Sequence, residues 1–149
     1  MSQIEYIKIE NLHSHPNNPR KDLGDLAELA NSIKVNGVMQ NLTVTPMVVE
    51  ETGQIMQSEY KVVIGHRRKA AAKLAGLVEL PCMVVVMDER QQLATMMLEN
   101  IQRSDLTVYE QAQGFQMMLD LGETVESISL DTGFSATTIR RRTKLLVLP

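Results

Sequence analysis

The stretch that most constrains this chain is a strand that passes into a helix across a single glycine, at residues 60–72 (YKVVIGHRRKAAA). Residues 60–64 are β-prone and mostly apolar, whereas residues 69–74 are rich in alanine and lysine, which favour helices. Gly65 can adopt backbone angles that other residues avoid. The pattern therefore predicts one tight turn, around which the rest of the chain is organised.

Two arginines, Arg67 and Arg68, follow on the first turn of the expected helix. That turn carries unpaired N–H groups and the positive end of the helix dipole, and arginine forks beside such groups favour a phosphate. Gly65, His66, Arg67 and Arg68 are thus a candidate phosphate site. On this stretch alone, a buried turn with two solvated arginines is an equally good interpretation.

Composition limits the class of protein. A chain of 149 residues suits one domain with an appendage or two small domains, and its core must be filled by aliphatics and ten methionines, because it has only two Phe and no Trp. The net charge of −3 argues against a chain that is basic throughout, though not against a local basic element. With a lone Cys82, no signal-peptide pattern and no apolar run long enough for a bilayer, we expect a cytoplasmic protein without membrane contact.

The first hundred residues mix short strands and helices. We expect strands at 4–9, 42–45 and 80–86, a hairpin around Gly53 that leads into the strand before Gly65, and helices at 26–36, 67–75 and from 88 or 89 to 101. The segment from His13 to Arg20 is predicted to be a polar loop, since nothing completes a metal site with His13 and His15. The fold class is α+β around a small mixed sheet.

Beyond Asp105 the strand patterns stop. Thr107 and Glu110 form a capping box, and the helix that follows is predicted to turn Val108, Ala112, Phe115 and Leu119 inward. A short helix at 125–132, a turn at 133–135 and a helix from 136 to about 146 make a helix-turn-helix.

The last helix is a candidate DNA surface. From Gly133 onward the chain has four basic residues and no acidic one, in a protein of net negative charge. A merely solvated basic face is the alternative. The candidate DNA-binding residues are Ser135, Thr137, Thr138, Arg140, Arg141, Arg142 and Lys144.

Glu99 and Asn100 are adjacent oxygen donors near a helix end, with Arg103 one turn further on. A carboxylate and an amide oxygen suit Mg²⁺, which takes its other ligands from water and phosphate. Such pairs are usually just solvated. Together with the arginine turn, they indicate a nucleoside triphosphate with its metal.

Several segments taken in order resemble the ParB family of chromosome and plasmid partition proteins, over nearly the whole length. These segments are Asn18-Pro19-Arg20, Ser32-Ile33 through Gln40, Gly65-His66-Arg67-Arg68, Glu99 through Leu106, and Leu145 through Pro149. The resemblance implies a sulfiredoxin-like nucleotide-binding domain at 1–103 and the start of a helix-turn-helix domain at 104–149. Family members continue beyond that point, so we expect either a truncated chain or a very short relative.

What the resemblance implies about function is a CTP-dependent clamp on double-stranded DNA. In the family, CTP with Mg²⁺ binds the first domain, the helix-turn-helix binds a palindromic centromere-like site, two subunits close around DNA, and a ParA-like ATPase is the partner. Carried over by motif, Gly65, His66, Arg67, Arg68 and Arg103 would contact the nucleotide. Glu99 and Asn100 would hold the metal, and Gln40 occupies the glutamine position of the first motif.

The sequence departs from the family at His66, where Gly-Glu-Arg-Arg is usual, and at Asn41, where proline usually follows the glutamine. A neutral imidazole does not supply the negative charge that Mg²⁺ favours. CTP hydrolysis is therefore left open, with Gln40 and His66 as catalytic candidates. We expect a divergent member of the family.

Three rival interpretations remain at this stage. Sulfiredoxins use a Gly-Cys-His-Arg turn with a catalytic cysteine, but here the cysteine of that turn is missing and Cys82 lies in an apparent core strand. A ParB-like nuclease would use His66 beside an arginine for phosphodiester chemistry. A helix-turn-helix repressor would need no nucleotide at all.

Overall fold

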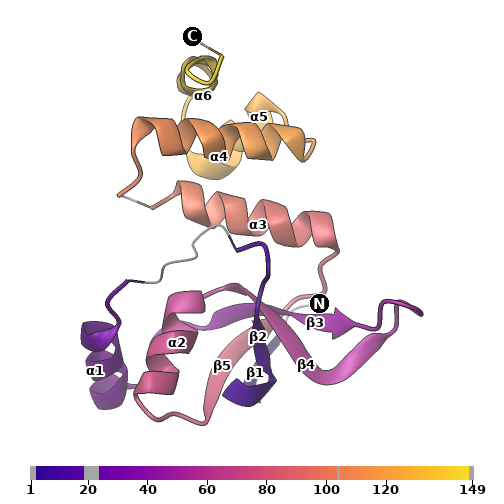
Figure 1. Cartoon of the computed structure of the whole chain (residues 1–149), viewed down its shortest axis with the longest axis vertical. Coiled ribbons are helices and arrows are strands. Elements are labelled where there is room, and N and C mark those ends of the chain that lie inside the picture. Colours follow the sequence, from indigo (N-terminus) through magenta and orange to yellow (C-terminus); the bar gives the residue numbers. More distant parts are fainter. Residues whose placement is uncertain (1–2, 19–23, 104, 148–149) are drawn as a thin grey trace. The chain divides into compact units, whose positions relative to one another are not determined.

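A computed structural model describes residues 3–18, 24–103 and 105–147, and its strands and α-helices are labelled in Figure 1. The chain forms two compact units that divide between Asp88 and Glu89. The first contains β1 (Gln3–Lys8), η1 (Ile9–Asn11), β2 (Leu12–Ser14), α1 (Ala27–Asn36), β3 (Leu42–Val48), β4 (Ile55–Ile64), α2 (His66–Leu74) and β5 (Glu79–Val84). The second contains α3 (Glu89–Ile101), α4 (Val108–Asp120), α5 (Val125–Thr132) and α6 (Ala136–Lys144).

The five strands form one mixed sheet in the order β1-β5-β3-β4-β2, which confirms the predicted α+β class. Adjacent pairs are antiparallel for β1–β5 and β3–β4, and parallel for β3–β5 and β2–β4. Because side chains alternate across a strand, buried Val63 lies on the opposite face from its neighbour Val62, and most of the buried strand residues share the face of Val62. That face carries the buried residues Ile7, Leu12, Leu42, Val44, Val62, Leu80 and Cys82.

Helices α1 and α2 lie beside each other against this apolar face (Figure 1). Ile33 of α1 and the fully buried Ala71 and Ala72 of α2 complete the core. The alanines leave little bulk between helix and sheet, so the backbone of α2 lies close to the strands. Gly37 follows α1 with φ of 74°, as predicted for the end of that helix.

The predicted loop from His13 to Arg20 is wrong at its start. Leu12–Ser14 is strand β2, which pairs in parallel with Tyr60–Val62 of β4, and the next residue, His15, is only 2% exposed. A strand of only three residues is too short to show a periodic pattern, and its pairing partner lies far away in sequence. Pro19 and Arg20 of the first family segment lie outside the described residues.

The other element bounds differ less from prediction. The hairpin between β3 and β4 is present, although β3 runs on to Val48 rather than ending at Thr45. β5 ends at Val84, two residues early, and α6 ends at Lys144. No helix in the described ranges is long and apolar enough to cross a membrane.

The second unit has its own core, formed by all four helices. Met97 and Ile101 of α3 pack with Phe115 and Met118 of α4, Ile128 of α5 and Ile139 of α6. Phe134, in the turn between α5 and α6, meets Phe115 edge-on with ring centroids 5.4 Å apart. Because α3 packs on α4, its contacts place it in the helical unit. The predicted boundary between a nucleotide-binding domain at 1–103 and a DNA-binding domain at 104–149 stays a prediction.

The capping box of Thr107 and Glu110 is present, but the predicted inward stripe of α4 is partly wrong. Ala112 and Phe115 are buried as predicted, whereas Val108 is 47% exposed and Met118 is buried instead. At about 100° per residue, the buried face of this helix centres between Phe115 and Met118. Val108 shares this face, about 20° from Phe115, but it is the first residue of the helix and is exposed there.

We predict that Gly114→Ala destabilises the helical unit. A Cβ there would lie 2.6 Å from Cγ1 of Ile101, which is itself 1% exposed. Alanine gains about 1 kcal/mol of helix propensity over glycine, but overpacking costs about 1–3 kcal/mol. Because buried Ile101 has little room to move, the clash should dominate and lower the urea midpoint.

The matched control is Gln113→Ala, on the exposed side of the same helix. It should leave the midpoint almost unchanged, since a surface substitution away from special features costs little. A Gly114→Ala protein as stable as this control would contradict the packing of α3 on α4.

Candidate functional site

The turn between β4 and α2 is built on Gly65. Its φ of 108° lies in the region that favours glycine, and an added Cβ would lie 2.8 Å from Cγ of Leu42 at the start of β3. The carbonyl of Gly65 accepts the first helical hydrogen bond, from Lys69 N–H at 2.9 Å. Both the backbone angles and the close approach to β3 therefore require glycine here.

The two arginines after the turn point to different neighbours. Nη2 of Arg67 donates to the carbonyl of Asp25 at 3.1 Å, just before α1, and Nη1 of Arg68 donates to the carbonyl of Asn41 at 2.6 Å. Gln40, the candidate of the first motif, is exposed and directly precedes Asn41. The structure thus gathers Asp25, Gln40–Asn41 and Gly65–Arg68 around the start of α2.

His66 is half-buried and connects α2 to the end of β2. Its Nε2 accepts a hydrogen bond from the backbone N–H of His15 at 3.3 Å, which requires an unprotonated Nε2. The Nδ1 of His15 in turn accepts from the backbone N–H of Asn17 at 3.1 Å. Sequence reasoning missed His15, because its role depends on burial and on a partner 51 residues away.

The proposed metal residues lie on α3, in the second unit. Glu99 is exposed, and the side-chain oxygen of Asn100 accepts a hydrogen bond from Nη1 of Arg103 at 3.2 Å. Nε and Nη2 of Arg103 also donate to the two carboxylate oxygens of Asp105, at 3.1 and 2.7 Å. No group of three or more His, Cys, Asp or Glu that could hold a metal occurs among the described residues.

A carboxylate beside an amide oxygen is a donor set that fits Mg²⁺ with water and phosphate as further ligands. Arg103 orients the amide, since it holds the oxygen of Asn100 from one turn along the helix. The Gly65–Arg68 turn belongs to the first unit, and Glu99, Asn100 and Arg103 belong to the second. Ser104 lies outside the described residues.

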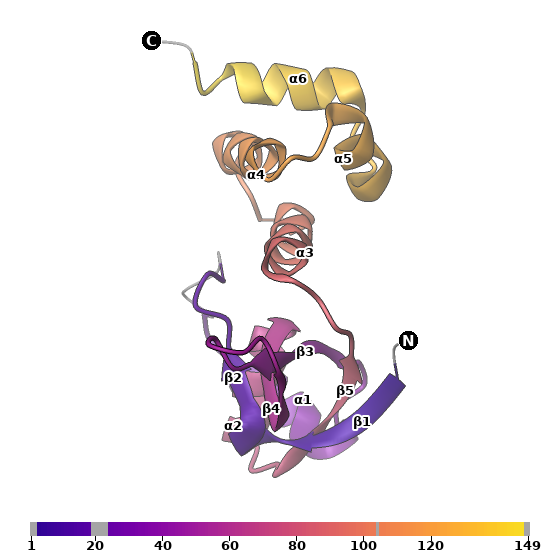
Figure 2. The same cartoon turned by 90° about the vertical axis from the view of Figure 1, so that its right-hand side faces the viewer.

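The helix-turn-helix is present and closely capped (Figure 2). Gly133 ends α5 with φ of 83°, and the hydroxyl of Ser129 donates to the carbonyl of Phe134 at 2.6 Å. Ser135 caps α6 by accepting from the N–H of Thr138 at 3.1 Å. These local bonds fix the angle at which α6 leaves the turn.

The exposed surface of α6 is narrower than predicted. Thr137, Arg140, Arg141 and Lys144 line a shallow hollow of about 330 Å³. Arg142 was predicted to be exposed, but it is half-buried and its Nε donates to the side-chain oxygen of Gln111 on α4 at 3.2 Å. Three consecutive arginines on a helix cannot share one face, because successive residues are about 100° apart.

Cys82 is unsuited to nucleophilic chemistry. It is fully buried in β5, and burial, followed by the nearby charge of Glu5, raises the pKa of its thiol to about 11. Only the thiolate is an effective nucleophile. A cysteine-based reaction of the sulfiredoxin type therefore has no support from this residue.

Comparison with known proteins decides the family. Residues 1–101 match the family model of the ParB N-terminal domain. The chain belongs to the ParB family. The chromosome-partitioning protein Spo0J of Thermus thermophilus is 34% identical over 96% of this chain, and a probable chromosome 1-partitioning protein ParB of Deinococcus radiodurans is 35% identical over 99%. The chain spans about half the length of these curated relatives (51% and 49%).

Two solved structures of a ParB relative are similar over nearly the whole chain. C-terminally truncated ParB of Caulobacter crescentus complexed to the centromeric parS site has a TM-score of 0.80 at 33% identity, covering 97% of this chain and 73% of that one. The same protein complexed with CTP-γ-S has a TM-score of 0.60 at 34% identity, covering 99% of this chain and 80% of that one. The predicted family resemblance is thereby confirmed.

Proposed function

We propose that this chain is a CTP-dependent, DNA-binding partition protein that closes as a clamp on a palindromic, centromere-like site. The observation that carries the proposal is the combination, in one ParB-family chain, of a glycine turn with two oriented arginines and a separate helix-turn-helix. A relative about one third identical has been crystallised both with CTP-γ-S and with parS, which supports both halves of the proposal.

The triphosphate of CTP binds at the start of α2. Gly65 allows the ligand to approach the backbone, the first-turn N–H groups of α2 face it, and Arg67 and Arg68 supply positive charge. Hydrogen bonds to the carbonyls of Asp25 and Asn41 hold the two guanidinium groups near that turn before the nucleotide binds. Less side-chain entropy is then lost on binding.

Glu99 and Asn100 would hold Mg²⁺, and the ion supplies positive charge that neutralises part of the triphosphate. Arg103 keeps the oxygen of Asn100 oriented, so it is a positioning residue for the metal as well as a candidate nucleotide contact.

DNA binds along α6. Thr137, Arg140, Arg141 and Lys144 form the surface that meets the phosphate backbone and the groove, while Ser135 and Thr138 fix the start of the helix. Arg142 holds α6 on α4 through Gln111. Two copies of the chain close around DNA when nucleotide and site are both bound, and a ParA-like ATPase is the partner in the cytoplasm.

Our prediction for the phosphate turn concerns Arg68→Ala. The variant loses one or two charge-assisted hydrogen bonds to phosphate, each worth about 1.5–3 kcal/mol. CTP affinity should therefore fall roughly 10- to 150-fold per bond in isothermal titration with Mg²⁺. Arg141→Ala makes the same substitution on α6 and should bind CTP as the wild type does.

The same titration, run with ATP, GTP and UTP, separates the rival interpretations. Selective binding of CTP supports the proposal, whereas a wild-type chain that binds no nucleotide would support a simple repressor. Unchanged CTP affinity in Arg68→Ala, with a wild-type circular dichroism spectrum, would refute the assignment of the turn.

For the DNA surface, the double change Arg140→Glu and Arg141→Glu should abolish specific DNA binding and leave CTP binding intact. Reversed charge repels the phosphates, and wild-type affinity should itself fall steeply with salt because binding releases counterions. Fluorescence anisotropy with a labelled duplex measures both effects. Arg68→Ala is the reciprocal control, since it should keep the salt-dependent DNA affinity of the isolated chain. A double variant that still finds its site would place the DNA surface elsewhere.

We predict that His66→Glu raises CTP hydrolysis. A carboxylate at this position can still accept from the His15 N–H and would add a ligand for Mg²⁺ beside the triphosphate. At millimolar Mg²⁺ we expect direct contact with the ion to outweigh repulsion from phosphate. Phosphate release from CTP, measured with DNA present, should rise while CTP affinity changes little.

His66→Gln is the matched control, because it keeps an acceptor for His15 without adding charge, and its phosphate release should stay at the wild-type rate. Brisk hydrolysis by the wild type that collapses in both variants would show that the imidazole itself is the functional group.

A further inference from the structure

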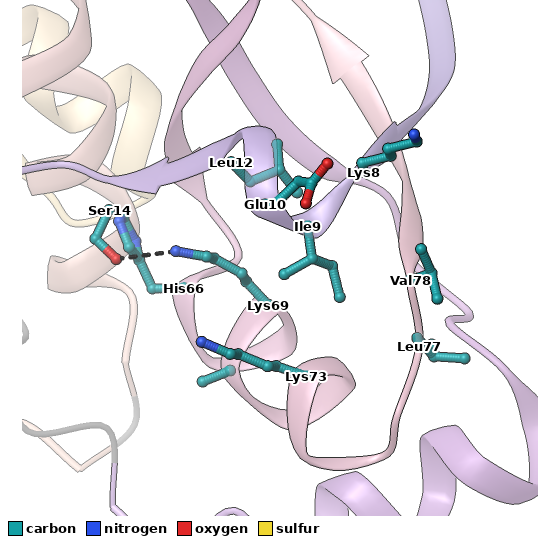
Figure 3. Close-up of a pocket in the computed structure, with 11 residues that line it drawn as sticks. Lys8, Ile9, Glu10, Leu12, Ser14, His66, Lys69, Lys73, Leu77 and Val78 are labelled. Atoms are coloured by element: carbon teal, nitrogen blue, oxygen red, sulfur yellow. Dashed lines mark hydrogen bonds between the residues drawn. The ribbon is translucent and has the colours of Figure 1, made fainter.

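A pocket of the first unit lies between α2 and the η1–β2 segment, with a volume of about 780 Å³ (Figure 3). Its polar lining includes Ser14, His66, Lys69 and Lys73. Neither Arg67 nor Arg68 lines it. The pocket is therefore separate from the arginine contacts described above, although His66 borders both.

Helix geometry explains the separation. His66, Lys69 and Lys73 stand at i, i+3 and i+7, so they share one face of α2. Arg67 and Arg68 are rotated by about 100° and 200° from His66 and reach Asp25 and Asn41 instead. One short helix thus presents two basic groups in different directions.

The cationic end of the pocket is formed by two lysines. Figure 3 shows Lys69 and Lys73 directed from α2 toward Ser14 and His66, and Nζ of Lys69 donates to Oγ of Ser14 at 3.3 Å. Among residues 3–18, 24–103 and 105–147, no carboxylate forms an ion pair with either lysine. Glu10, also in the lining, lies on η1 near Lys8 at the other side of the pocket.

The two ammonium groups repel each other in a partly desolvated place. The pKa of Lys69 is lowered, first by burial and then by the charge of Lys73. A bound anion would offset both effects on Lys69, because a nearby negative charge stabilises its charged form. The Ser14 hydroxyl in contact with Lys69, together with Lys73 in the same pocket, is also a donor set suited to a phosphate group.

The opposite wall of the pocket is apolar. Ile9 and Leu12 are buried, and Leu77 and Val78 complete the lining where the chain leaves α2 for β5. The volume lies within the usual range for sites that enclose a small molecule between apolar walls and a few polar groups. An inorganic anion would make no contact with this apolar wall, so the pocket favours an anion that carries an organic group.

We propose that this pocket binds a small phosphate monoester, whose phosphate contacts Lys69, Lys73 and Ser14 and whose organic group packs on Ile9, Leu12 and Leu77. The site is additional to the proposed nucleotide site, since it uses a different face of α2 and requires neither Arg67 nor Arg68.

The test is a titration of the full chain with phenyl phosphate, followed by ¹H–¹⁵N NMR. Backbone amides of residues 8–14 and 66–78 should shift, and phenyl phosphate should bind more tightly than inorganic phosphate because only the ester reaches the apolar wall. The double change Lys69→Gln and Lys73→Gln should weaken binding at least roughly tenfold.

The charge-matched control is the double change Lys34→Gln and Lys61→Gln, which removes two lysines outside the pocket and should leave the affinity for phenyl phosphate unchanged. Arg68→Ala should also bind phenyl phosphate normally, whatever its affinity for CTP. Equal loss in both double variants, or binding that disappears in Arg68→Ala, would overturn the proposal, because the probe would then be a general counter-ion or a ligand of the arginine turn.

Discussion

The close approach of Gly65 to Leu42 is the contact on which the first unit depends. It lets the end of β4 and the start of β3 lie together while α2 begins, since there is no Cβ to separate them. The same closeness puts the carbonyl of Asn41 within 2.6 Å of Arg68. A side chain at position 65 would push Leu42 away and break the contact of Arg68 with Asn41. Both the packing of the sheet and the proposed phosphate binding therefore depend on the absence of a Cβ at this position.

Helix α2, held close to the sheet at its start, presents basic side chains on two different flanks. Ala71 and Ala72 are fully buried against the sheet, and their small size keeps the helix backbone close to the strands. Side chains on the two flanks can then reach loops on either side: Arg67 extends to the residues before α1, and Lys69 extends to the end of β2. Bulkier residues on the inner face would move both flanks outward and lengthen these contacts.

Local chemistry made much of this architecture predictable. The glycine turn, the capping box of Thr107 and the turn after α5 each depend on residues within a few positions of one another, and all are present. The contacts that could not be predicted join residues far apart in the sequence. His15 contacts His66 across 51 residues and Lys69 contacts Ser14 across 55. Arg142 contacts Gln111 across 31. Such pairs leave no periodic pattern, because the sheet and the helix packing bring them together.

The arginines of α6 show how packing divides a sequence of identical residues into different roles. Ile139 is fully buried, so Thr137, Arg140, Arg141 and Lys144 form an outward stripe at i, i+3, i+4 and i+7, while Arg142 turns toward α4. Arg140 contacts Glu126 at 3.4 Å, but both side chains are more than half exposed, and such pairs contribute about 0–1 kcal/mol. In the proposed DNA complex, exchanging that carboxylate for a phosphate would therefore cost little, whereas moving Arg142 would break its hydrogen bond to Gln111 on α4.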